Sequence, residues 1–483
     1  MSSKYNYLVS TDMNKLILVA CIVFLISSCS KETEIPQDNL KPVAVMLPDH
    51  FQSGIIKEDT INFYLPFGTN LKSIKTNFIL GTNQTLSVIN GSLLDLSVPK
   101  EVSISQANSN RKMILKAVVP AKAPTAVRGV WISNVGSVSL STPEEIELTV
   151  NKINELGFNC AFVVVYNKSK TLHKSSVLKR ILGASSEDAV QIYPGWDPLK
   201  VFVDKAHAKG LKVIAWFEYG FASHYSGMPS PLIVAHPDWA AQDINGANSM
   251  KNNFYWLNGF HPDVQKYMTD LITEVVTNYD VDGVQGDDRL PSMPINSGYD
   301  TYTTALYQKE SGKPAPTLDT DADWMQWRAG KLTDFGKNLY TAIKAIKPSC
   351  TVAFSPGISG WSYQNYLQQW DKWLEKGIVD IISPQLYRNE SQGIKAYTDL
   401  VDKDLNGVLS RDPVYMKKYF PGILVKSGTY TTTDNYLADC IKYNRSKGIE
   451  GEVVFYYDGI ENNRRVYNAF YPVKAIFPSP VSN

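Results

Sequence analysis

The sequence predicts a (β/α)8 barrel, the TIM-barrel fold, preceded by a small all-β sandwich domain. Two observations predict the barrel. Eight apolar, strand-like runs alternate with helical patterns, and a helix repeatedly ends at a glycine with an apolar run directly after it. A third observation, a series of short strand-like runs without helical periodicity nearer the N-terminus, predicts the sandwich. A doubly wound open sheet is the alternative, but no Gly-rich phosphate-binding turn follows any of the strands.

The composition is that of a packed, soluble protein. The chain has 483 residues, which suits two domains, and 44% are hydrophobic and 20% charged. The 48 basic and 47 acidic residues nearly cancel, so nucleic acid is not an expected partner, and neither is an anionic membrane surface. The 27 Tyr and 10 Trp are many. Most will serve the core, but such rings also suit a cleft that stacks on sugar faces.

The N-terminus is predicted to be a lipoprotein signal peptide covering residues 1–29. The apolar run at 16–26 is shorter than the roughly 20 residues of a membrane span and has the length of a signal-peptide apolar region. It runs into Ile-Ser-Ser-Cys at 26–29, which resembles a bacterial lipobox and implies cleavage before Cys29 and lipidation of that thiol. A simple secreted protein or a short anchor helix is the alternative. Residues 30–40 are predicted to be a tether, which gives a bacterial cell-envelope protein anchored to a membrane by lipid.

The cysteines and histidines indicate no metal site. Cys21 leaves with the signal peptide, and the remaining Cys160, Cys350 and Cys440 are far apart and show no CxxC spacing. They are expected to be small buried apolar residues. The six His show no HxH or HExxH pattern, so neither a metal nor another cofactor is expected.

The two predicted domains meet at a proline-bounded linker. Residues 41–120 contain short runs such as 61–65 and 113–119, separated by turn residues, and predict an immunoglobulin-like β-sandwich that serves as a spacer or binding module. Pro120 to Pro124 are the predicted linker. Residues 125–483 are predicted to form the barrel.

The joint between helix and strand is clearest at the first barrel helix. Thr142 and Pro143, followed by two Glu, are typical of a helix start with a capping box. Gly157 ends that helix, and the apolar run 160–165 follows as a buried strand. Residues 264–276 show apolar positions at spacings of three and four, which predicts a helix with one buried face. The eight strands are predicted near residues 128–135, 159–166, 212–219, 281–287, 351–356, 380–386, 420–426 and 452–457.

Three carboxylates at predicted strand ends are the candidate catalytic residues. In this fold the active face is formed by the carboxyl ends of the strands. Asp287 and Asp288 end strand four, where two neighbouring carboxylates split each other's pKa values. Glu218 ends strand three and is the candidate partner, because glycoside hydrolysis needs two carboxyl groups flanking the bond. Structural alternatives remain open: an N-cap Asp with a salt bridge to Arg289, and an ion pair for Glu218.

Rings, amides and arginines around these carboxylates are the candidate substrate-binding residues. Rings would stack on sugar faces, and amides and guanidinium groups would hold hydroxyls. The predicted set is Trp131, Asn134, Trp216, Tyr219, Gln285, Arg289, Arg328, Gln385, Tyr387, Tyr457 and Asp458. Asp458 and Glu461 are also weaker rivals for a catalytic role, and Asp282, in mid-strand before a glycine, is interpreted as structural.

Five ordered motifs resemble one known family, glycoside hydrolase-like family 10. They are Arg-Gly-Val-Trp at 128–131, Gly-Leu-Lys-Val-Ile-Ala-Trp-Phe-Glu at 210–218, Trp-Leu-Asn with His-Pro-Asp-Val at 256–264, Tyr-Asp-Val-Asp-Gly-Val-Gln-Gly-Asp-Asp at 279–288, and Ile-Ser-Pro-Gln-Leu-Tyr at 382–387. The resemblance covers about residues 125–475. It implies a glycosidase-like barrel, often in a lipoprotein, that acts on polysaccharide, with cell-wall glycan strands as the leading candidate.

The strand-four motif is also similar to the nucleophile motif of α-amylase-type barrels. That similarity implies Asp287 as the nucleophile. The chain departs from the α-amylase pattern in two places: Gln285 stands where those enzymes have Arg, and strand five ends at Ser355-Pro356 without a Glu to act as acid.

The sequence therefore predicts a lipid-anchored glycoside hydrolase that acts as a monomer on a polysaccharide. Asp287 would be nucleophile or base, Glu218 the acid, and Asp288 a modulator of both. The alternative is a non-catalytic carbohydrate-binding lipoprotein with a degenerate glycosidase barrel, which the missing strand-five Glu keeps open. A scaffold protein is a third class, disfavoured by the cluster of polar strand ends. The absence of GxSxG and GxxxxGK[ST] disfavours serine hydrolases and nucleotide chemistry.

Overall fold

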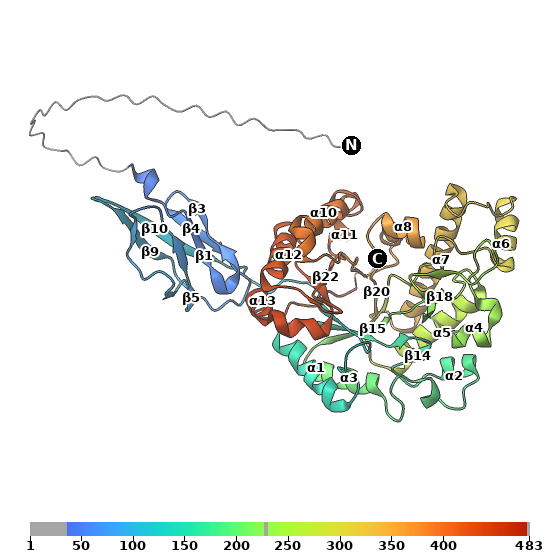
Figure 1. The fold of residues 1–483 in the computed structure, drawn as a ribbon. Coiled ribbons are helices and arrows are strands. Elements are labelled where there is room, and N and C mark those ends of the chain that lie inside the picture. The colour runs from blue at the N-terminus through green and yellow to red at the C-terminus, as the bar shows by residue number, and fades with distance from the viewer. Residues whose placement is uncertain (1–35, 227–229, 481–483) are drawn as a thin grey trace, which may run out of the picture.

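The computed structural model of the chain describes residues 36–226 and 230–480 and contains two hydrophobic cores (Figure 1). One core lies within residues 45–115 and the other within residues 126–475. The predicted signal peptide, its Cys29 and the first part of the tether lie outside the described residues. None of the helices in the described ranges is long and apolar enough to cross a membrane.

The first core belongs to a β domain with two main sheets. One sheet has the order β2-β1-β6 and the other β3-β4-β10-β9-β7, and β5 and β8 form a separate pair. Side chains alternate between core and solvent along the long strand β10, where Met113 and Leu115 are buried. The strands are β1 (Ala44–Leu47), β2 (Gln52–Ser53), β3 (Ile55–Lys57), β4 (Thr60–Tyr64), β5 (Ile74–Lys75), β6 (Asn77–Ile79), β7 (Thr85–Leu86), β8 (Leu93–Leu94), β9 (Lys100–Gln106) and β10 (Ser109–Val118).

The β domain contacts the second domain through an aromatic pair and an ion pair between Asp49 and Arg465 (3.9 Å). Phe51 follows the short helix η2 (Pro48–His50) and stacks on Phe470, with ring centroids 6.5 Å apart. The Arg465 guanidinium lies 5.6 Å from the centre of the Phe51 ring. Both partners belong to the last helix, α13 (Arg464–Phe470). The contact is small beside the two separate cores.

Because each domain has its own core, residues 125–483 are expected to fold without the β domain. That fragment should unfold in one cooperative transition, with a modest loss of stability from uncovering Phe470. Thermal unfolding of the fragment beside the chain from residue 30 measures this. A fragment that cannot fold alone would show that the two domains form one folding unit.

The second domain is built on one eight-stranded, fully parallel sheet with the order β21-β20-β19-β15-β12-β11-β25-β22. Each of the eight predicted strand regions contains one of these strands. They are β11 (Arg128–Ile132), β12 (Cys160–Val164), β15 (Lys212–Phe217), β19 (Gly283–Gly286), β20 (Thr351–Phe354), β21 (Ile381–Ile382), β22 (Gly422–Leu424) and β25 (Glu452–Phe455).

The two edges of this sheet also meet. Ile382 N donates to Lys418 O (2.8 Å), Phe420 N donates to Ile382 O (3.0 Å), and Gly422 N donates to Pro384 O (2.8 Å). These bonds join the β21 segment to the β22 segment through parallel bridges. The sheet is therefore curled so that its first and last strands lie side by side.

Helices follow the strands and cover the outside of the sheet (Figure 1). The expected cap at Thr142 is present, since its side chain accepts from Glu145 N at 3.2 Å. Gly157 has φ +77°, and a Cβ there would lie 2.3 Å from Tyr471 O, so only glycine fits. The helices are α1 (Pro143–Glu155), α2 (Ser176–Leu182), α3 (Pro198–Ala208), α4 (Pro231–Ala235), α5 (Pro262–Asn278), α6 (Thr301–Ser311), α7 (Ala322–Ile346), α8 (Trp361–Tyr366), α9 (Trp370–Glu375), α10 (Gly393–Asn406), α11 (Pro413–Met416), α12 (Asp434–Ser446) and α13.

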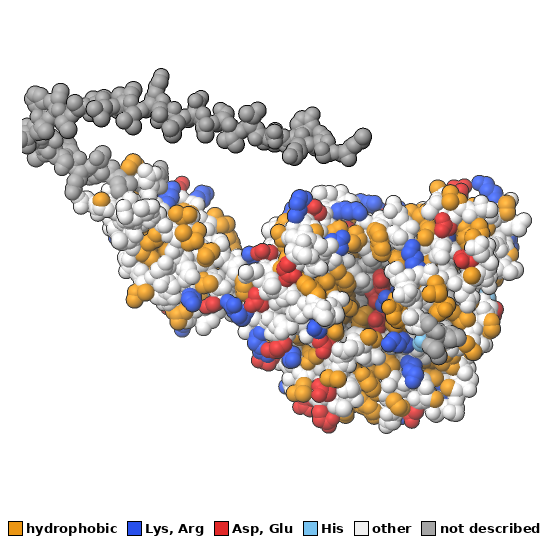
Figure 2. All heavy atoms as spheres, viewed as in Figure 1, with side chains coloured by type: hydrophobic (Ala, Val, Ile, Leu, Met, Phe, Trp, Pro, Cys, Tyr) orange, Lys and Arg blue, Asp and Glu red, His pale blue; other side chains and the backbone are white. Residues whose placement is uncertain are grey.

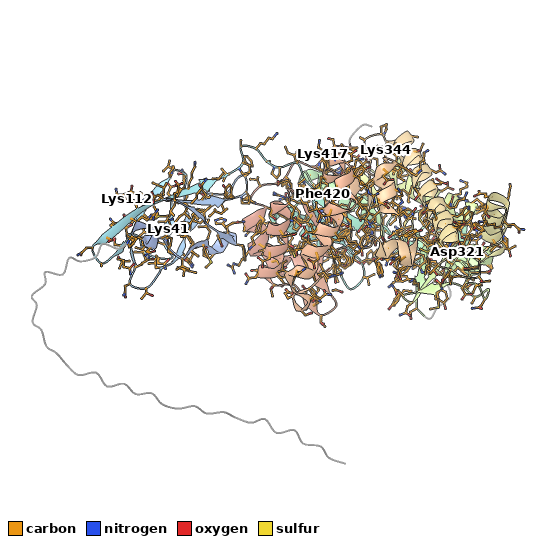
Figure 3. All side chains as sticks on the ribbon, turned by 90° about the horizontal axis from the view of Figure 1, so that it is seen from above. Lys41, Lys112, Asp321, Lys344, Lys417 and Phe420 are labelled. Atoms are coloured by element: carbon orange, nitrogen blue, oxygen red, sulfur yellow. The ribbon has the colours of Figure 1, made fainter. Side chains whose placement is uncertain are left out.

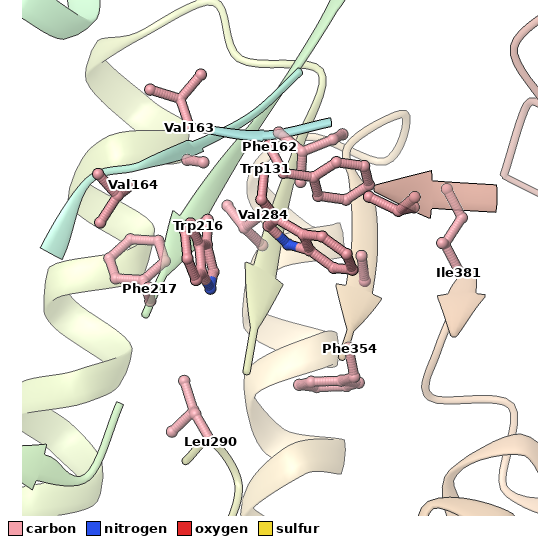
Figure 4. Packing of buried hydrophobic residues seen from close by; sticks show 14 of the residues in the cluster. Trp131, Phe162, Val163, Val164, Trp216, Phe217, Val284, Leu290, Phe354 and Ile381 are labelled. Carbon is pink, nitrogen blue, oxygen red and sulfur yellow. The ribbon is translucent and has the colours of Figure 1, made fainter. Parts of the chain in front are cut away.

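The strands are buried on both faces, as a parallel sheet covered by helices requires. All five residues of β11 and of β12 are buried. Figure 4 shows Trp131, Phe162 and Trp216 packed among aliphatic side chains of neighbouring strands. Cys160, Cys350 and Cys440 are free and buried, as expected.

Short hairpins and one small sheet extend beyond the carboxyl ends of the strands. The pair β13 (Tyr166–Asn167) and β14 (Lys170–Thr171) follows β12, and the pair β23 (Lys426–Ser427) and β24 (Tyr430–Thr431) follows β22. A three-stranded antiparallel sheet follows β15; its strands are β16 (Ala222–Tyr225), β17 (Met250–Lys251) and β18 (Phe254–Trp256). These additions stand on the face where a barrel enzyme would hold its substrate.

Candidate active site

Glu218 and Asp287 lie at the same level on neighbouring strands. In the pairing of β15 with β19, Phe217 lies opposite Gly286, and each carboxylate is the next residue in its strand. Asp288 follows directly. In Figure 2 acidic side chains lie in a hollow of the second domain, with hydrophobic and basic side chains around it. The predicted juxtaposition of the strand-three and strand-four carboxylates is thus present in the structure.

Asp287 is buried and its carboxylate oxygens receive four hydrogen bonds. Oδ2 accepts from Trp216 Nε1 (3.1 Å) and from Arg289 Nη2 (3.2 Å). Oδ1 accepts from Gln385 Nε2 (2.5 Å) and from the backbone N–H of Asp288 (2.8 Å). Only 3% of Asp287 is exposed. Its position is therefore fixed by donors from the ends of strands three, four and six.

Arg289 joins all three carboxylates. Its Nη2 lies 3.7 Å from Glu218 Oε1 as well as 3.2 Å from Asp287 Oδ2, and its Nη1 lies 3.5 Å from Asp288 Oδ1. Its Nε donates to the carbonyl of Glu218 at 2.9 Å. Because both oxygens lie near the same Nη2 atom, Glu218 Oε1 and Asp287 Oδ2 are at most about 7 Å apart, an upper limit that is compatible with the roughly 5–9.5 Å between the two carboxyl groups of glycosidases.

Glu218 is held less tightly than Asp287. Its Oε2 accepts from Asn167 Nδ2 at 3.0 Å, and the same nitrogen donates to Asn134 Oδ1 at 2.6 Å. Burial raises the pKa of Glu218 above its ordinary value, and the charge of Asp288 adds to this, while Arg289 and the Asn167 hydrogen bond act in the opposite direction. Glu218 therefore stays protonated to a higher pH than an exposed glutamate would.

Burial also raises the pKa of Asp287, and the Asp288 charge adds to it, while Arg289 and the Asp288 N–H oppose the shift. All four of its partners, however, are N–H donors, and the Gln385 nitrogen is identified as a donor by its second contact to Ser355 O at 3.2 Å. A protonated carboxyl would need an acceptor for its O–H. The hydrogen bonds thus favour a carboxylate at Asp287, whereas burial favours the protonated form of Glu218.

Asp288 differs from its neighbour in being open to solvent. Its side chain is 34% exposed, and its Oδ1 has no hydrogen-bond partner. Its charge raises the pKa of both Asp287 and Glu218, after burial, which is the larger cause in each case. This placement agrees with a modulating role.

The pKa direction at Glu218 gives a pH prediction. If Glu218 donates a proton, turnover should fall only as pH rises through its raised pKa. Asn167→Ala removes a hydrogen bond that lowers this pKa, so the alkaline limb of kcat/KM should move to higher pH. A pH–rate profile of both proteins measures the shift. An alkaline limb that stays in place in Asn167→Ala would contradict the role of Glu218 as the acid.

Four of the predicted stacking rings are buried, which corrects the sequence-based interpretation. Trp131, Trp216 and Tyr219 are 1%, 2% and 4% exposed. Tyr457 is 9% exposed, and Lys152 Nζ lies 5.4 Å from its ring centre. With so little of their surface exposed, these rings do not form the open stacking walls that the sequence suggested. Trp216 acts instead through its indole N–H, which donates to Asp287.

Of the predicted aromatic wall only Tyr387 is partly open. It is half-buried, stacked on Phe455 with centroids 5.2 Å apart, and its edge meets Trp131. Tyr387 lies in the segment after β21, two residues beyond Gln385. Tyr387 remains a candidate for contact with substrate.

Arg328 does not belong to the site. It is fully buried in α7, and its guanidinium donates to the carbonyls of Ile295, Ser297 and Asp319. All three acceptors lie in the segment between β19 and α7. The residue therefore holds that segment together and has no donor to offer a sugar hydroxyl.

The predicted amides position other protein groups. Gln385 holds Asp287, Asn134 accepts from Asn167, and Gln285 accepts from Trp131 Nε1 at 2.7 Å. Asp458 is half-buried in the short helix η7 (Tyr457–Asn463), and its buried Oδ2 has no hydrogen-bond partner.

The acidic residues given lesser roles by the sequence lie elsewhere. Glu461 pairs with Arg464 Nε at 2.7 Å on the surface. Asp282, as expected, is structural: it accepts from Val213 N and pairs with Lys212 and His207.

Sequence reasoning missed three residues that shape the site. Asn167 touches Glu218, Phe254 lies 4.9 Å beneath the Arg289 guanidinium, and Tyr366 lies close enough for the charges of Asp288 and Arg289 to act on it. Asn167 stands at a strand end and could have been selected by that rule. Phe254 and Tyr366 come from insertions, where no strand position marks them.

Within the described ranges, no three His, Cys, Asp or Glu residues gather as a possible metal site. A cavity of about 410 Å³ lies at the opposite end of the sheet, near the starts of β20 and β21. Its lining includes Thr351, Asp380, Lys417 and Phe420, and Figure 3 shows Lys417, Phe420 and Lys344 close together in this region. This cavity is separate from the three carboxylates.

Comparison with known proteins points to glycoside hydrolases. A family model described as Glycosyl hydrolase-like 10 matches residues 126–415. The glycosyl hydrolase DigH of Escherichia coli (strain K12) is 27% identical over 319 residues, which are 56% of this chain and 67% of that protein. The glycosyl hydrolase YngK of Bacillus subtilis (strain 168) is 23% identical over 330 residues, 61% of this chain and 60% of that protein.

Solved structures of low sequence identity share the fold. The PgaB (BpsB) glycoside hydrolase domain from Bordetella bronchiseptica aligns with a TM-score of 0.54 and 13% identity, covering 73% of this chain and 100% of that chain. The catalytic domain of a beta-amylase from Paenibacillus polymyxa aligns with a TM-score of 0.50 and 11% identity, covering 73% and 98%. The resemblance seen in the sequence motifs is confirmed, and the chain belongs to the glycosyl hydrolase-like 10 family.

Proposed function

We propose that this chain hydrolyses O-glycosidic bonds in a polysaccharide, in a closed (β/α)8 barrel and as a monomer. The observation that carries the proposal is the pair Glu218 and Asp287. One carboxyl group accepts four N–H donors and the other only one, and a single guanidinium nitrogen lies between them. Glycoside hydrolysis requires two carboxyl groups in opposite protonation states across the bond.

In this mechanism Glu218 protonates the oxygen of the departing sugar, while the ionised Asp287 acts on the anomeric carbon as nucleophile or through a water molecule as base. Trp216, Gln385 and the Asp288 N–H hold Asp287 in place, so little reorganisation accompanies the reaction. Arg289 lies beside both groups and balances the negative charge of three neighbouring carboxylates. The Asp288 charge favours the proton on Glu218.

A non-catalytic carbohydrate-binding protein is the second candidate. The observation that favours it is the end of β20, where Ser355 and Pro356 stand in place of a carboxylate. In the present proposal the acid comes from strand three and the strand-five position is not needed. The two candidates therefore differ in whether the strand-three group transfers a proton.

The experiment is incubation of the chain from residue 30 with a panel of polysaccharides that includes peptide-stripped peptidoglycan, because cell-wall glycan strands are the leading substrate candidate. New reducing ends should appear with at least one member of the panel. Binding without new reducing ends would favour the second candidate.

Lipid attachment at Cys29 is the proposed means of localisation to the cell envelope. The apolar run before Cys29 is too short to anchor the chain well by itself. Cys29→Ala should release the protein from membranes or stop its maturation, as measured by membrane fractionation and by metabolic labelling with a fatty acid. Unchanged processing and membrane retention of this variant would contradict lipid anchoring.

A further inference from the structure

Two insertions meet beside the carboxylates and form a bridge. The turn between β17 and β18 comes from the insertion after strand three, and α8 comes after strand five. Lys251 Nζ donates to Asn365 Oδ1 at 3.2 Å, and Asn252 Nδ2 donates to the hydroxyl of Tyr366 at 2.6 Å. The insertions after strands three and five are thus tied together on either side of strand four, which carries Asp287 and Asp288.

Tyr366 connects this bridge to the carboxylates. Its carbonyl accepts from Met293 N at 3.1 Å and from Ser292 Oγ at 3.3 Å, both in the segment just after Asp288. Burial raises the pKa of Tyr366 to about 12, and the Asp288 charge contributes to the shift. The bridge therefore stands within electrostatic reach of the reacting groups.

The bridge exposes one aromatic ring with donors beside it. Trp361, the first residue of α8, is 48% exposed, whereas the other tryptophans in the described ranges are buried or half-buried. Its ring packs against Tyr366 with centroids 5.6 Å apart, and Lys251 Nζ lies 5.0 Å from the Tyr366 ring centre. Lys251 has three N–H donors and Asn365 takes one.

An exposed tryptophan on its own needs no function. Trp361 differs because its ring packs against Tyr366, which also contacts Lys251, and because Asn365 Nδ2 donates to the Trp361 carbonyl at 3.0 Å. A rigid ring with a few polar groups at its edge is the arrangement that binds a sugar, whose C–H face is apolar and whose rim carries hydroxyls. The bridge is hydrogen-bonded to the segment that follows Asp288, so this surface lies on the same side of the sheet as the carboxylates.

We propose that Trp361, supported by Tyr366 and flanked by Lys251, is a stacking subsite for a pyranose ring of the glycan chain, at least one sugar away from the bond that is cleaved. The inference rests on the proposed function and deepens it, because it makes the substrate a chain long enough to reach both the carboxylates and this ring. Lys251 would donate to an oxygen on the rim of the stacked sugar.

The test compares short and long glycans on Trp361→Ala and Trp361→Phe. The probes are peptide-free glycan strands prepared from peptidoglycan and sorted by length, from a single disaccharide unit to strands of several units. With long strands, Trp361→Ala should raise KM and Kd about tenfold, which corresponds to about 1.4 kcal/mol of lost stacking, and should leave kcat unchanged. With the shortest strand, Trp361→Ala should have the same KM and Kd as the unmodified protein. With long strands, Trp361→Phe should raise KM and Kd less than Trp361→Ala does.

Tyr64→Ala is the matched control, because Tyr64 is a comparably exposed ring, 57% exposed, on the β domain. It should change neither constant. Lys251→Met should also weaken the binding of long strands and leave the binding of the shortest strand unchanged. Thermal unfolding of each variant shows that it is folded.

The outcomes separate this subsite from the proposed function. The subsite is overturned if Trp361→Ala has the same KM and Kd for long strands as the unmodified protein. It is also overturned if the variant's KM and Kd rise equally for short and long strands. In both cases the hydrolase proposal stands. If the unmodified protein cleaves no strand but binds long strands through Trp361, hydrolysis fails and the subsite stands. If it neither cleaves nor binds any strand, both fail.

Discussion

Asp287→Asn is expected to lose at least about 10²–10⁴-fold in turnover while it still binds glycan. The substitution keeps the size of the side chain and removes the charge that the mechanism places at the anomeric carbon. The proposed binding surface, on Tyr387 and Trp361, does not include Asp287, so glycan affinity should change little. Turnover and Kd measured on the same glycan check both statements.

The same variant should be less stable than the unmodified protein. An asparagine amide turns one N–H₂ group toward two of the four donors that now face Asp287, either toward Trp216 and Arg289 or toward Gln385 and the Asp288 N–H. Leaving buried donors unpaired costs about 1–3 kcal/mol. The expected result is a lower midpoint of thermal unfolding, and turnover should be compared well below that midpoint.

Asp288→Asn is the control for this prediction. It removes a neighbouring charge from a side chain that is 34% exposed and has no such donors to lose, so it should affect turnover and stability less. Full turnover in Asp287→Asn, with turnover abolished in Asp288→Asn, would exchange the roles of the two residues.

Glu218→Gln is expected to slow turnover by about 10²–10⁴-fold on natural glycans, whose leaving sugar needs a proton. Aryl glycosides with acidic phenols need none, so their turnover should fall little. The Asn167 hydrogen bond can persist with a glutamine oxygen as acceptor, and stability should hold because a half-buried acidic group is replaced by a neutral one. Turnover across leaving groups of increasing acidity measures the effect.

Glu461→Gln serves as the matched control, because Glu461 is a surface residue paired with Arg464. Glu461→Gln should leave the turnover of natural glycans and of aryl glycosides unchanged. If Glu218→Gln slowed natural glycans and acidic aryl glycosides to the same extent, Glu218 would act on the structure of the site and would not be the proton donor.

The strand pattern predicted the fold well because burial on both faces leaves a direct mark in the sequence. The runs 128–135 and 159–166 contain β11 and β12, and every residue of those two strands is buried. The pairing of Phe217 with Gly286 then brings Glu218 to the side of Asp287. The catalytic candidates could therefore be identified from the sequence, because parallel strands end at a common face.

The aromatic wall could not be predicted in the same way. Trp131 and Trp216 stand at strand ends, but their side chains point into the interior, where barrel strands pack in layers. Arg328 was predicted to bind sugar hydroxyls, yet its guanidinium donates to the carbonyls of Ile295 and Ser297, which are distant in sequence. Strand position fixes how far along the curled sheet a residue lies, whereas side-chain direction depends on neighbours from other strands.

The effect of Asp287→Asn on stability is a second property that the sequence alone does not predict. Two adjacent aspartates suggest mutual repulsion, from which neutralising one would stabilise the fold. The structure places Arg289 and three further donors around Asp287, so the expected sign reverses. Arg289 and the Asp288 N–H are local to residues 279–290, but Trp216 and Gln385 come from two other strands, and no local pattern in residues 279–290 reveals those two donors.

The central claim is that Glu218 and Asp287 together break a glycosidic bond with water. The most direct measurement is the incorporation of isotopically labelled water oxygen into new reducing ends, followed by mass spectrometry for the unmodified protein and for Asp287→Asn. We expect labelled ends from the unmodified protein, and bound but uncleaved glycan with the variant. Glycan bound by the unmodified protein with no labelled ends, or equal labelling by both proteins, would contradict the claim.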